Sequence, residues 1–173
     1  ANNVGMYCCG PTVYNYVHIG NLRAYIFNDL LRRYLKYTGF KLKHVMNITD
    51  VEDKIIRDSQ KEKKSLKEFT EFYTSAFLED MKALNIEIPE IMPKATETIK
   101  EMVEIVKLLD SKGFTYEHDG DIYLSVKKFK GYGKLANLDE KNLLDNADGR
   151  LSNADGYEKE NARDFALWKN YDK

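Results

Sequence analysis

The chain has 173 residues, of which 43% are hydrophobic, which is enough for one globular domain that buries roughly 70% of its unfolded surface. Its formal net charge of −1 excludes the overall basic field of a dedicated nucleic-acid-binding protein, so any contact with nucleic acid must rest on a local patch. No apolar run approaches the roughly 20 residues that cross a bilayer, and the start lacks the features of a signal peptide, so no membrane partner is expected.

The first predicted element is a buried strand over residues 6–9, an apolar run that ends at Gly10-Pro11. It holds the only two cysteines, Cys8 and Cys9. Neighbouring residues of a strand point to opposite faces, so these two thiols could not easily form a disulfide, and a reducing, cytoplasmic setting fits best. Without further context, both would be small apolar core residues rather than metal ligands.

A helix is predicted from Ile19 to Tyr37, because apolar residues recur at helical spacing and Gly39 follows as a C-terminal residue that tolerates positive φ. The apolar positions are Leu22, Ile26, Phe27, Leu30, Leu31, Tyr34 and Leu35. The first turn would present unpaired N–H groups and the positive end of the helix dipole, which suits a phosphate. A nucleotide site is therefore predicted near the beginning of the chain.

Residues 42–48 form a second strand candidate, and the resulting βαβ pattern predicts a parallel, right-handed pair. A short helix is predicted over residues 50–59. A longer one is predicted over residues 65–84, where Ser65 and Glu68 have the spacing of a capping box.

A third helix is predicted to begin near residue 95, after Pro93, and to stop at Gly113. Its apolar face would consist of Ile99, Met102, Val103, Val106 and Leu109. Residues 114–126 then alternate in polarity around Asp119-Gly120, which is typical of a β-hairpin.

Residues 127–161 are polar and rich in Gly, Asn and Asp, which indicates a surface insertion with one short helical turn near residues 140–144. The predicted fold is α/β. Residues 1–113 would form the first half of a Rossmann-like domain with a parallel sheet flanked by helices. Residues 114–162 would form a small inserted α+β subdomain, and residues 163–173 would begin the return to the catalytic domain.

The segment between the first strand and the first helix has neither the Gly-Lys-Ser/Thr of a Walker loop nor the three spaced glycines of a dinucleotide fingerprint. Instead, residues 18–21, His-Ile-Gly-Asn, resemble the His-Ile-Gly-His signature of class I aminoacyl-tRNA synthetases. Residues 9–15, 47–56 and 164–169 resemble, in the same order, three blocks of cysteinyl-tRNA synthetases. The chain is identified as a member of that family and as the amino-terminal part of its catalytic domain, cut at both ends from something longer.

The resemblance implies ATP-dependent activation of L-cysteine to cysteinyl-adenylate and transfer of the cysteine to tRNA(Cys), with ATP bound as its Mg²⁺ complex. It also implies one Zn²⁺ ion that binds the substrate thiolate, because soft thiolate binds zinc far better than the hydroxyl of serine does. The family's other zinc ligands and its Lys-Met-Ser-Lys-Ser loop belong to a region after Lys173. The segment alone is therefore expected to be inactive, and the parent protein is expected to be a cytoplasmic monomer.

Site residues carry over from matching motif positions. Cys9 is implied to be the first zinc ligand and to line the cysteine pocket with Gly10 and Thr49. The residues implied to surround ATP are Gly10, Thr12, His18, Gly20 and Asn21. His18 and Asn21 are the implied catalytic pair, although Asn21 stands where the signature has its second histidine and cannot carry a positive charge.

Two alternatives remain open. A related ligase joins activated cysteine to an amino sugar in mycothiol synthesis and shares the cysteine and histidine motifs, but residues 47–54 and 164–169 favour the synthetase. The other alternative is a non-catalytic module that binds nucleotide or tRNA. Residues 61–64, Lys-Glu-Lys-Lys, together with Lys127, Lys128 and Lys130, could contact the phosphates of tRNA, but an ordinary solvated surface is the better explanation for most of these lysines.

Several other conspicuous residues have simpler explanations. His44 and His118 match no chemical constellation and are expected to be structural or solvent-facing. The carboxylates from Asp50 to Asp53 could hold a metal ion, but local ion pairs and helix caps are the usual role of such a cluster. The role of Asp50 itself stays open. Tyr14, Tyr16 and Tyr25 are expected to fill the core rather than to stack on a base.

Overall fold

The computed structural model describes residues 2–135 and 164–170, which belong to two compact units, residues 1–99 and residues 100–173. The first unit contains β1 (Asn3–Cys8), α1 (Ile19–Tyr37), β2 (Lys41–Met46), α2 (Asp53–Lys61), α3 (Leu66–Ala83) and the 3₁₀ turn η1 (Ala95–Glu97). From the boundary onward come α4 (Ile99–Ser111), β3 (Thr115–His118), β4 (Asp121–Leu124), the 3₁₀ turn η2 (Val126–Lys128) and β5 (Phe165–Trp168). None of the helices in the described part of the chain combines the length and apolarity needed to cross a lipid bilayer.

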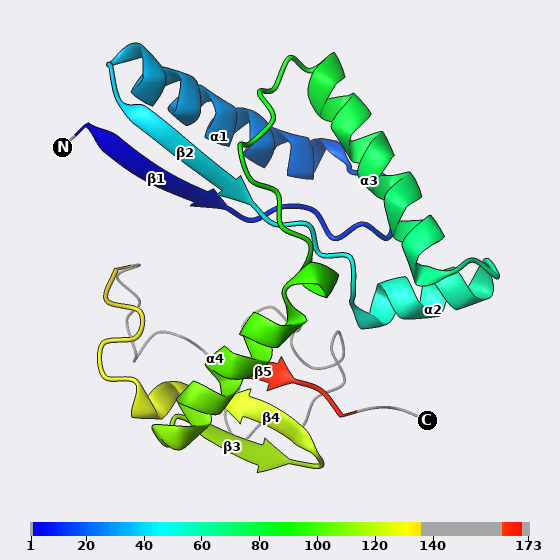
Figure 1. Ribbon diagram of the computed structural model, residues 1–173, viewed down its shortest axis with the longest axis vertical. Helices are drawn as coiled ribbons and strands as arrows, with labels where there is room; N and C mark the ends of the chain where they lie inside the picture. The colour runs from blue at the N-terminus through cyan, green and yellow to red at the C-terminus, as the bar shows by residue number, and fades with distance from the viewer. Residues whose placement is uncertain (1, 136–163, 171–173) are drawn as a thin grey trace. The chain divides into compact units, whose positions relative to one another are not determined.

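The first unit is built around the predicted βαβ arrangement. β1 and β2 pair in parallel, in a register that runs from Asn3 opposite Lys41 to Cys8 opposite Met46. Figure 1 shows α1, in blue, lying alongside the two strands that it connects. Parallel strands need such a crossover connection, because a short hairpin can join only antiparallel strands. The predicted α/β class is therefore confirmed.

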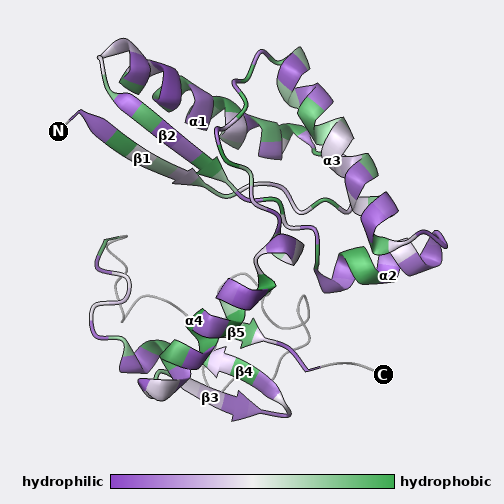
Figure 2. Ribbon diagram, in the orientation of Figure 1, coloured by the Kyte–Doolittle hydropathy of each residue, from purple (hydrophilic) through white to green (hydrophobic). Residues whose placement is uncertain are grey.

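Burial along β1 differs from the prediction of a buried strand. Within β1 only Cys8 is buried, and the Tyr7 side chain is 64% exposed. Figure 2 shows hydrophilic and hydrophobic residues following one another along β1 and β2. Among the described residues β1 has a strand neighbour on the β2 side alone, so most of its side chains keep contact with solvent.

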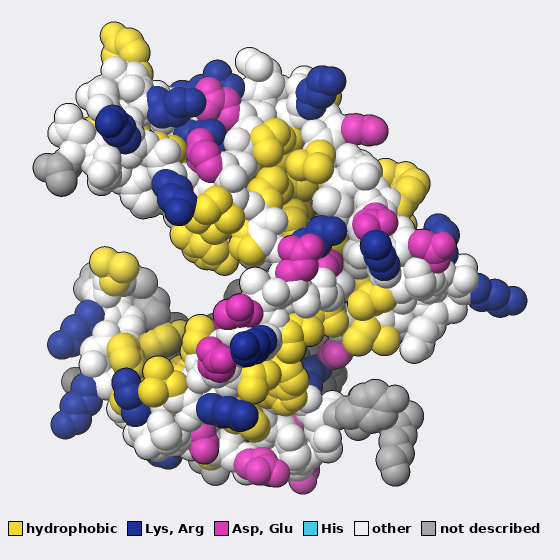
Figure 3. Space-filling view, in the orientation of Figure 1, with side chains coloured by type: hydrophobic (Ala, Val, Ile, Leu, Met, Phe, Trp, Pro, Cys, Tyr) yellow, Lys and Arg dark blue, Asp and Glu magenta, His cyan; other side chains and the backbone are white. Residues whose placement is uncertain are grey.

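α1 has the predicted bounds, but it does not bury the predicted apolar positions. The residues that it buries are Tyr25, Asp29 and Arg32. Most of the apolar positions are exposed, namely Ile26, Phe27, Leu30, Leu31 and Tyr34, and Figure 3 shows that hydrophobic side chains reach the surface of this unit. The inward face of α1 includes a charged pair instead, in which the Arg32 guanidinium lies 2.6 Å from the Glu90 carboxylate.

The core of the first unit joins the strand ends to α1, α2 and α3. Its buried members are Cys8, Val13, Tyr25, Met46, Ile48, Ile55, Phe69, Phe77, Met81 and Ile86. The rings of Tyr25 and Phe77 meet edge to face with their centroids 5.1 Å apart, which ties α1 to α3. This core holds the carboxyl ends of both strands in place.

Two helices begin later than predicted, and other contacts occupy the residues in front of them. α2 starts at Asp53, and the buried Asp50 carboxylate accepts from the Thr96 N–H at 2.9 Å and from the Thr96 hydroxyl at 2.6 Å. α4 starts at Ile99, and the predicted helix start is the 3₁₀ turn η1, whose Ala95 N–H donates to the Ile48 carbonyl at 3.0 Å. Asp50 is thus a structural anchor.

The second unit contains the predicted hairpin. β3 and β4 are antiparallel, and the turn residues Asp119 and Gly120 have φ values of 52° and 84°, as a left-handed hairpin turn requires. β5 adds to β4 as a third antiparallel strand. The helical turn predicted at residues 140–144 lies outside the described residues, and the predicted domain boundaries at residues 113 and 162 stay predictions.

Candidate functional site

The carboxyl ends of β1 and β2 bring together residues that the motifs singled out. Cys9, Gly10 and Thr12 follow β1, and Thr49 follows β2. Thr12 and Thr49 form a parallel bridge, so the two continuations run side by side beyond the regular strands. Ligands of open parallel sheets bind outside the carboxyl ends of the strands. These four residues therefore lie where such a fold places a ligand.

The two adjacent thiols have opposite environments. Cys8 is buried in the core, whereas Cys9 is exposed. Burial, followed by the charge of a Cys9 thiolate, raises the pKa of the Cys8 thiol. The same two causes, in the same order, raise the pKa of the Tyr25 phenol to about 12. Of the two sulfurs, Cys9 is therefore the one that a ligand can reach.

Gly10 lies where the segment after β1 closely approaches the segment after β2, so only glycine fits there. A Cβ atom at this position would lie 1.7 Å from the backbone oxygen of Asn47, which no side chain tolerates. The Gly10 N–H donates to Asn47 Oδ1 at 3.0 Å. This glycine therefore packs segment against segment, a role that its motif position did not reveal.

The start of α1 is organised by a reciprocal capping box. His18 is the N-cap residue, and its side-chain Nδ1 accepts a hydrogen bond from the backbone N–H of Gly20 at 3.0 Å. In return, the backbone N–H of His18 donates to Asn21 Oδ1 at 3.3 Å. A Cβ atom on Gly20 would lie 2.8 Å from His18 Cε1, so the glycine leaves room for the imidazole. Because Nδ1 accepts, the proton of the neutral ring sits on Nε2, which is then a donor.

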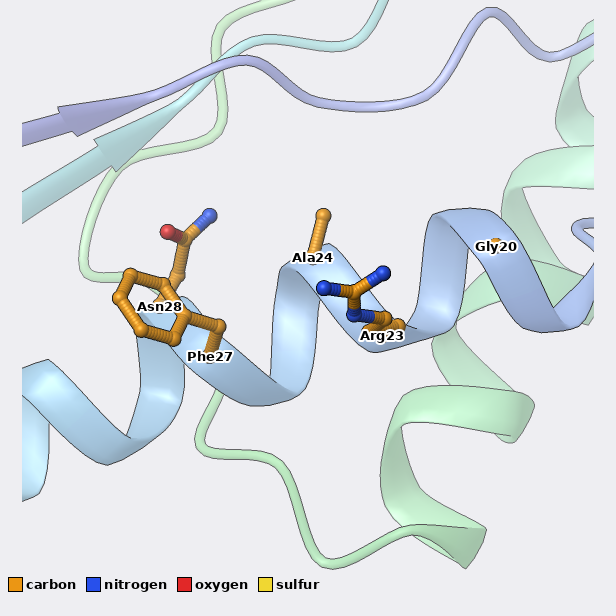
Figure 4. A pocket seen from close by; sticks show the side chains of 5 residues that line it. All are labelled: Gly20, Arg23, Ala24, Phe27 and Asn28. Atoms are coloured by element: carbon orange, nitrogen blue, oxygen red, sulfur yellow. The ribbon is translucent and has the colours of Figure 1, made fainter.

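A cavity of about 400 Å³ runs along α1 from this start. It is lined by Gly20, Arg23, Ala24, Phe27 and Asn28, and Figure 4 shows the side chains of Arg23, Ala24 and Asn28 projecting from the same side of the helix. The cavity combines an apolar surface with a guanidinium and an amide, which can donate to anionic or polar groups. Arg23 and Asn28 were not singled out in the sequence, because side chains with these functions are common on solvated helix faces.

Zinc requires more ligands than this part of the protein supplies. Among residues 2–135 and 164–170, no three His, Cys, Asp or Glu side chains come together in a way that could hold a metal ion. Cys9 offers one thiolate, whereas zinc in proteins takes three or four protein ligands. The described residues therefore fit one corner of a zinc site.

His44 is structural. It is 2% exposed, and its ring Nδ1 lies 3.3 Å from Arg32 Nη1. The backbone N–H of His44 donates to the Glu90 carboxylate at 2.8 Å. Burial, and after it the Arg32 charge, lower the pKa of the imidazole. This ring belongs to the ionic cluster beneath α1 and not to the strand-end site.

A comparison of folds finds the ternary complex of Agrobacterium radiobacter K84 agnB2 LeuRS with tRNA and LeuAMS. The match has a TM-score of 0.54 and 20% sequence identity, and it covers 68% of this chain and 16% of that one. At this identity the similarity shows the fold alone.

Sequence comparison is more specific. The chain is 56% identical over 171 residues to the cysteine–tRNA ligase of Brachyspira hyodysenteriae, covering 99% of this chain and 36% of that protein. It is 52% identical over 168 residues to that of Leptospira interrogans, covering 97% and 35%. The chain thus spans about a third of the length of these relatives. The family model described as the tRNA synthetases class I (C) catalytic domain matches residues 1–173, and the chain belongs to that family.

Proposed function

We propose that the chain is the amino-terminal part of the catalytic domain of a cysteine–tRNA ligase. The observation that carries this proposal is the identity of 46% to 56% to proteins of that name over nearly the whole chain. The strand-end site supports it, because a reachable thiol and a helix start without an acidic residue in its first turn follow the same strand. The setting would be the cytoplasm, where both thiols stay reduced.

The first reaction is the attack of a carboxylate oxygen of L-cysteine on the α-phosphorus of ATP. The bond from that phosphorus to the bridging oxygen breaks, pyrophosphate leaves with the electron pair, and cysteinyl-adenylate remains. In the second reaction a terminal hydroxyl of tRNA(Cys) attacks the carbonyl carbon, and AMP leaves. Negative charge on the phosphate oxygens grows in the first step, so preorganised donors accelerate it.

The start of α1 would supply those donors. His18 Nε2–H is one, since Nδ1 is already occupied by the Gly20 N–H. Asn21 Nδ2 is a second, since Oδ1 caps His18. The positive end of the helix dipole acts in the same direction. The backbone N–H groups of Gly20, Asn21 and Leu22 do not add to it, because each already donates to His18. Gly10 and Thr12 would line the same nucleotide site, with Mg²⁺ accompanying ATP.

The cysteine pocket would lie beside Cys9, Gly10 and Thr49. Zinc, when bound with Cys9 as one ligand, supplies a preference for thiolate over the hydroxyl of serine. The remaining ligands would come from outside the described residues. We therefore expect the complete protein to be active and the 173-residue segment to be inactive.

The test is amino-acid-dependent exchange of pyrophosphate into ATP, measured for the complete protein and for the segment. We expect exchange with cysteine, far weaker exchange with serine, and none from the segment. Charging of tRNA(Cys) rather than of an amino sugar would separate the proposal from the mycothiol-type ligase. Exchange by the segment at the rate of the complete protein would refute the proposal that residues outside the segment are needed for activity.

A further inference from the structure

The ladder between β1 and β2 is interrupted at the proposed cysteine pocket. Regular pairing ends with Cys8 opposite Met46 and resumes with Thr12 opposite Thr49. Between these pairs, residues 9–11 lie opposite only residues 47 and 48, so the β1 side carries one extra residue. An extra residue of this kind redirects the side chains around it, and such irregularities recur beside active sites.

The side chain of Asn47 fills this interruption. Its Oδ1 accepts hydrogen bonds from the Gly10 N–H at 3.0 Å and from the Tyr7 hydroxyl at 2.9 Å. Its Nδ2 donates to Thr49 Oγ1 at 3.1 Å. One amide therefore replaces the missing backbone pairing and links the β1 side to the β2 side.

These contacts act on both walls of the pocket. The Gly10 N–H belongs to the peptide bond between Cys9 and Gly10. Its hydrogen bond to Asn47 therefore fixes the backbone next to the Cys9 side chain. On the other wall, Thr49 Oγ1 accepts from Asn47, which leaves the Thr49 hydroxyl hydrogen free to donate to a ligand. The amide thus determines both where the thiol lies and how the hydroxyl points.

We infer that Asn47 is a positioning residue for the amino-acid substrate, which holds the Cys9–Gly10 segment against Thr49 and orients the Thr49 hydroxyl as a donor. Tyr7 assists by holding the amide oxygen, although the ring itself is 64% exposed. This inference rests on the proposed function, in which Cys9 and Thr49 line the cysteine pocket. Asn47 would touch neither substrate nor ATP.

The experiment compares three variants of the complete protein. Asn47→Ala removes all of these hydrogen bonds, Tyr7→Phe removes one, and Asn3→Ala is the matched control because Asn3 is exposed at the opposite end of β1. We expect the KM for cysteine to rise about 10-fold in Asn47→Ala and about 3-fold in Tyr7→Phe, with the KM for ATP within about 2-fold of the wild type. Asn3→Ala should match the wild type.

A second measurement does not depend on activity. After metal is removed with a chelator, alkylation of Cys9 by iodoacetamide is followed by mass spectrometry, with the buried Cys8 as internal reference. We expect the rate for Cys9 to change at least about 3-fold in Asn47→Ala, because its segment is no longer held, and not to change in Asn3→Ala.

The outcomes separate the inference from the proposed function. An unchanged KM for cysteine in both Asn47→Ala and Tyr7→Phe would overturn the inference. A parallel rise of both KM values together with a lower Tm would overturn it too, because it would show a general structural role. A wild-type protein without cysteine-dependent exchange would refute the proposed function, and the alkylation rates would then decide the role of Asn47 alone.

Discussion

Two helices of the first unit begin with the same device, and the difference between them separates a structural helix start from one that suits a ligand. α3 opens with Ser65 and Glu68 in a capping box, and the Glu68 carboxylate in its first turn faces the positive end of the helix dipole. α1 opens with His18 and Asn21 in the same reciprocal arrangement, but its first turn contains no acidic residue. The dipole of α3 is balanced internally, whereas that of α1 is left for an external anion.

The titration of Glu68 supports this contrast. The Ser65 hydroxyl, and after it the Ser65 N–H, hold the pKa of the Glu68 carboxyl below its usual range, so the charge stays in place at neutral pH. In α1 the corresponding partner, Asn21, is neutral. The same cap geometry thus serves stability in one helix and would serve phosphate binding in the other.

Removing the imidazole of α1 should have the largest effect. His18→Ala in the complete protein removes the Nε2–H donor and the cap on the Gly20 N–H. We expect kcat for pyrophosphate exchange to fall about 100-fold or more, because one preorganised donor to a developing oxyanion is lost. A fall of less than about 3-fold would show that the start of α1 is capped for stability alone, as that of α3 is.

Adding an acid to the first turn of α1 should turn it into a start of the α3 type. Asn21→Asp keeps a side-chain oxygen for the His18 N–H but places a negative charge where α1 has none. We expect the KM for ATP to rise about 10-fold by repulsion, while the helix gains roughly 0.5 kcal/mol from its dipole. Steady-state kinetics and thermal melting of the complete protein measure the two effects, and a KM that does not change would contradict an anion site here.

The matched change in α3 should affect stability alone. Ser65→Ala removes the hydroxyl that accepts from the Glu68 N–H. Loss of such a cap costs about 1 kcal/mol of folding stability, measured by denaturant unfolding of the complete protein. The KM values for ATP and cysteine should stay those of the wild type; a selective change in either would show that α3 also serves the site.

The smallest effect should be a pH dependence of folding stability caused by His44, which contacts Arg32 of α1. The pKa of His44 is lowered by burial and by Arg32, while Glu90 and Asp29 oppose that shift. The unfolded chain therefore takes up a proton more readily than the folded one, so stability is complete above about pH 6.5 and declines as the pH falls below it. Thermal melting at pH 7.5 and pH 5.5 should show a loss that is smaller in His44→Phe than in the wild type. An equal loss in both would assign the pH dependence to other groups.

The elements with strong local signals were predictable from the sequence. The bounds of α1, the Ser65–Glu68 capping box and the Asp119-Gly120 turn follow from apolar spacing, cap chemistry and left-handed φ values, all of which are encoded within a few residues. The exposure of β1 and of the apolar positions of α1 was not predictable. Both depend on which segments cover the strands and the helix in the folded chain, and a local sequence pattern does not encode such contacts.

The site follows the same division. The motif residues Cys9, Gly10, His18 and Thr49 could be named from the sequence, and the structure brings Cys9, Gly10 and Thr49 to the ends of two paired strands. The role of Asn47 could not be predicted, because it depends on the extra residue in the segment after β1 relative to the segment after β2. These two segments meet only in the folded chain. The capping box of α1, in which Asn21 pairs with His18, was missed because histidine is not among the common N-cap residues.

The most direct test is a crystal structure of the complete protein with a non-hydrolysable analogue of cysteinyl-adenylate. We expect the phosphate mimic to lie at the start of α1, within hydrogen-bonding distance of His18 Nε2. We expect the analogue's amino-acid part to lie beside Cys9 and Thr49. An analogue bound away from the first turn of α1, or with its sulfur remote from Cys9, would show that this strand end does not serve both substrates.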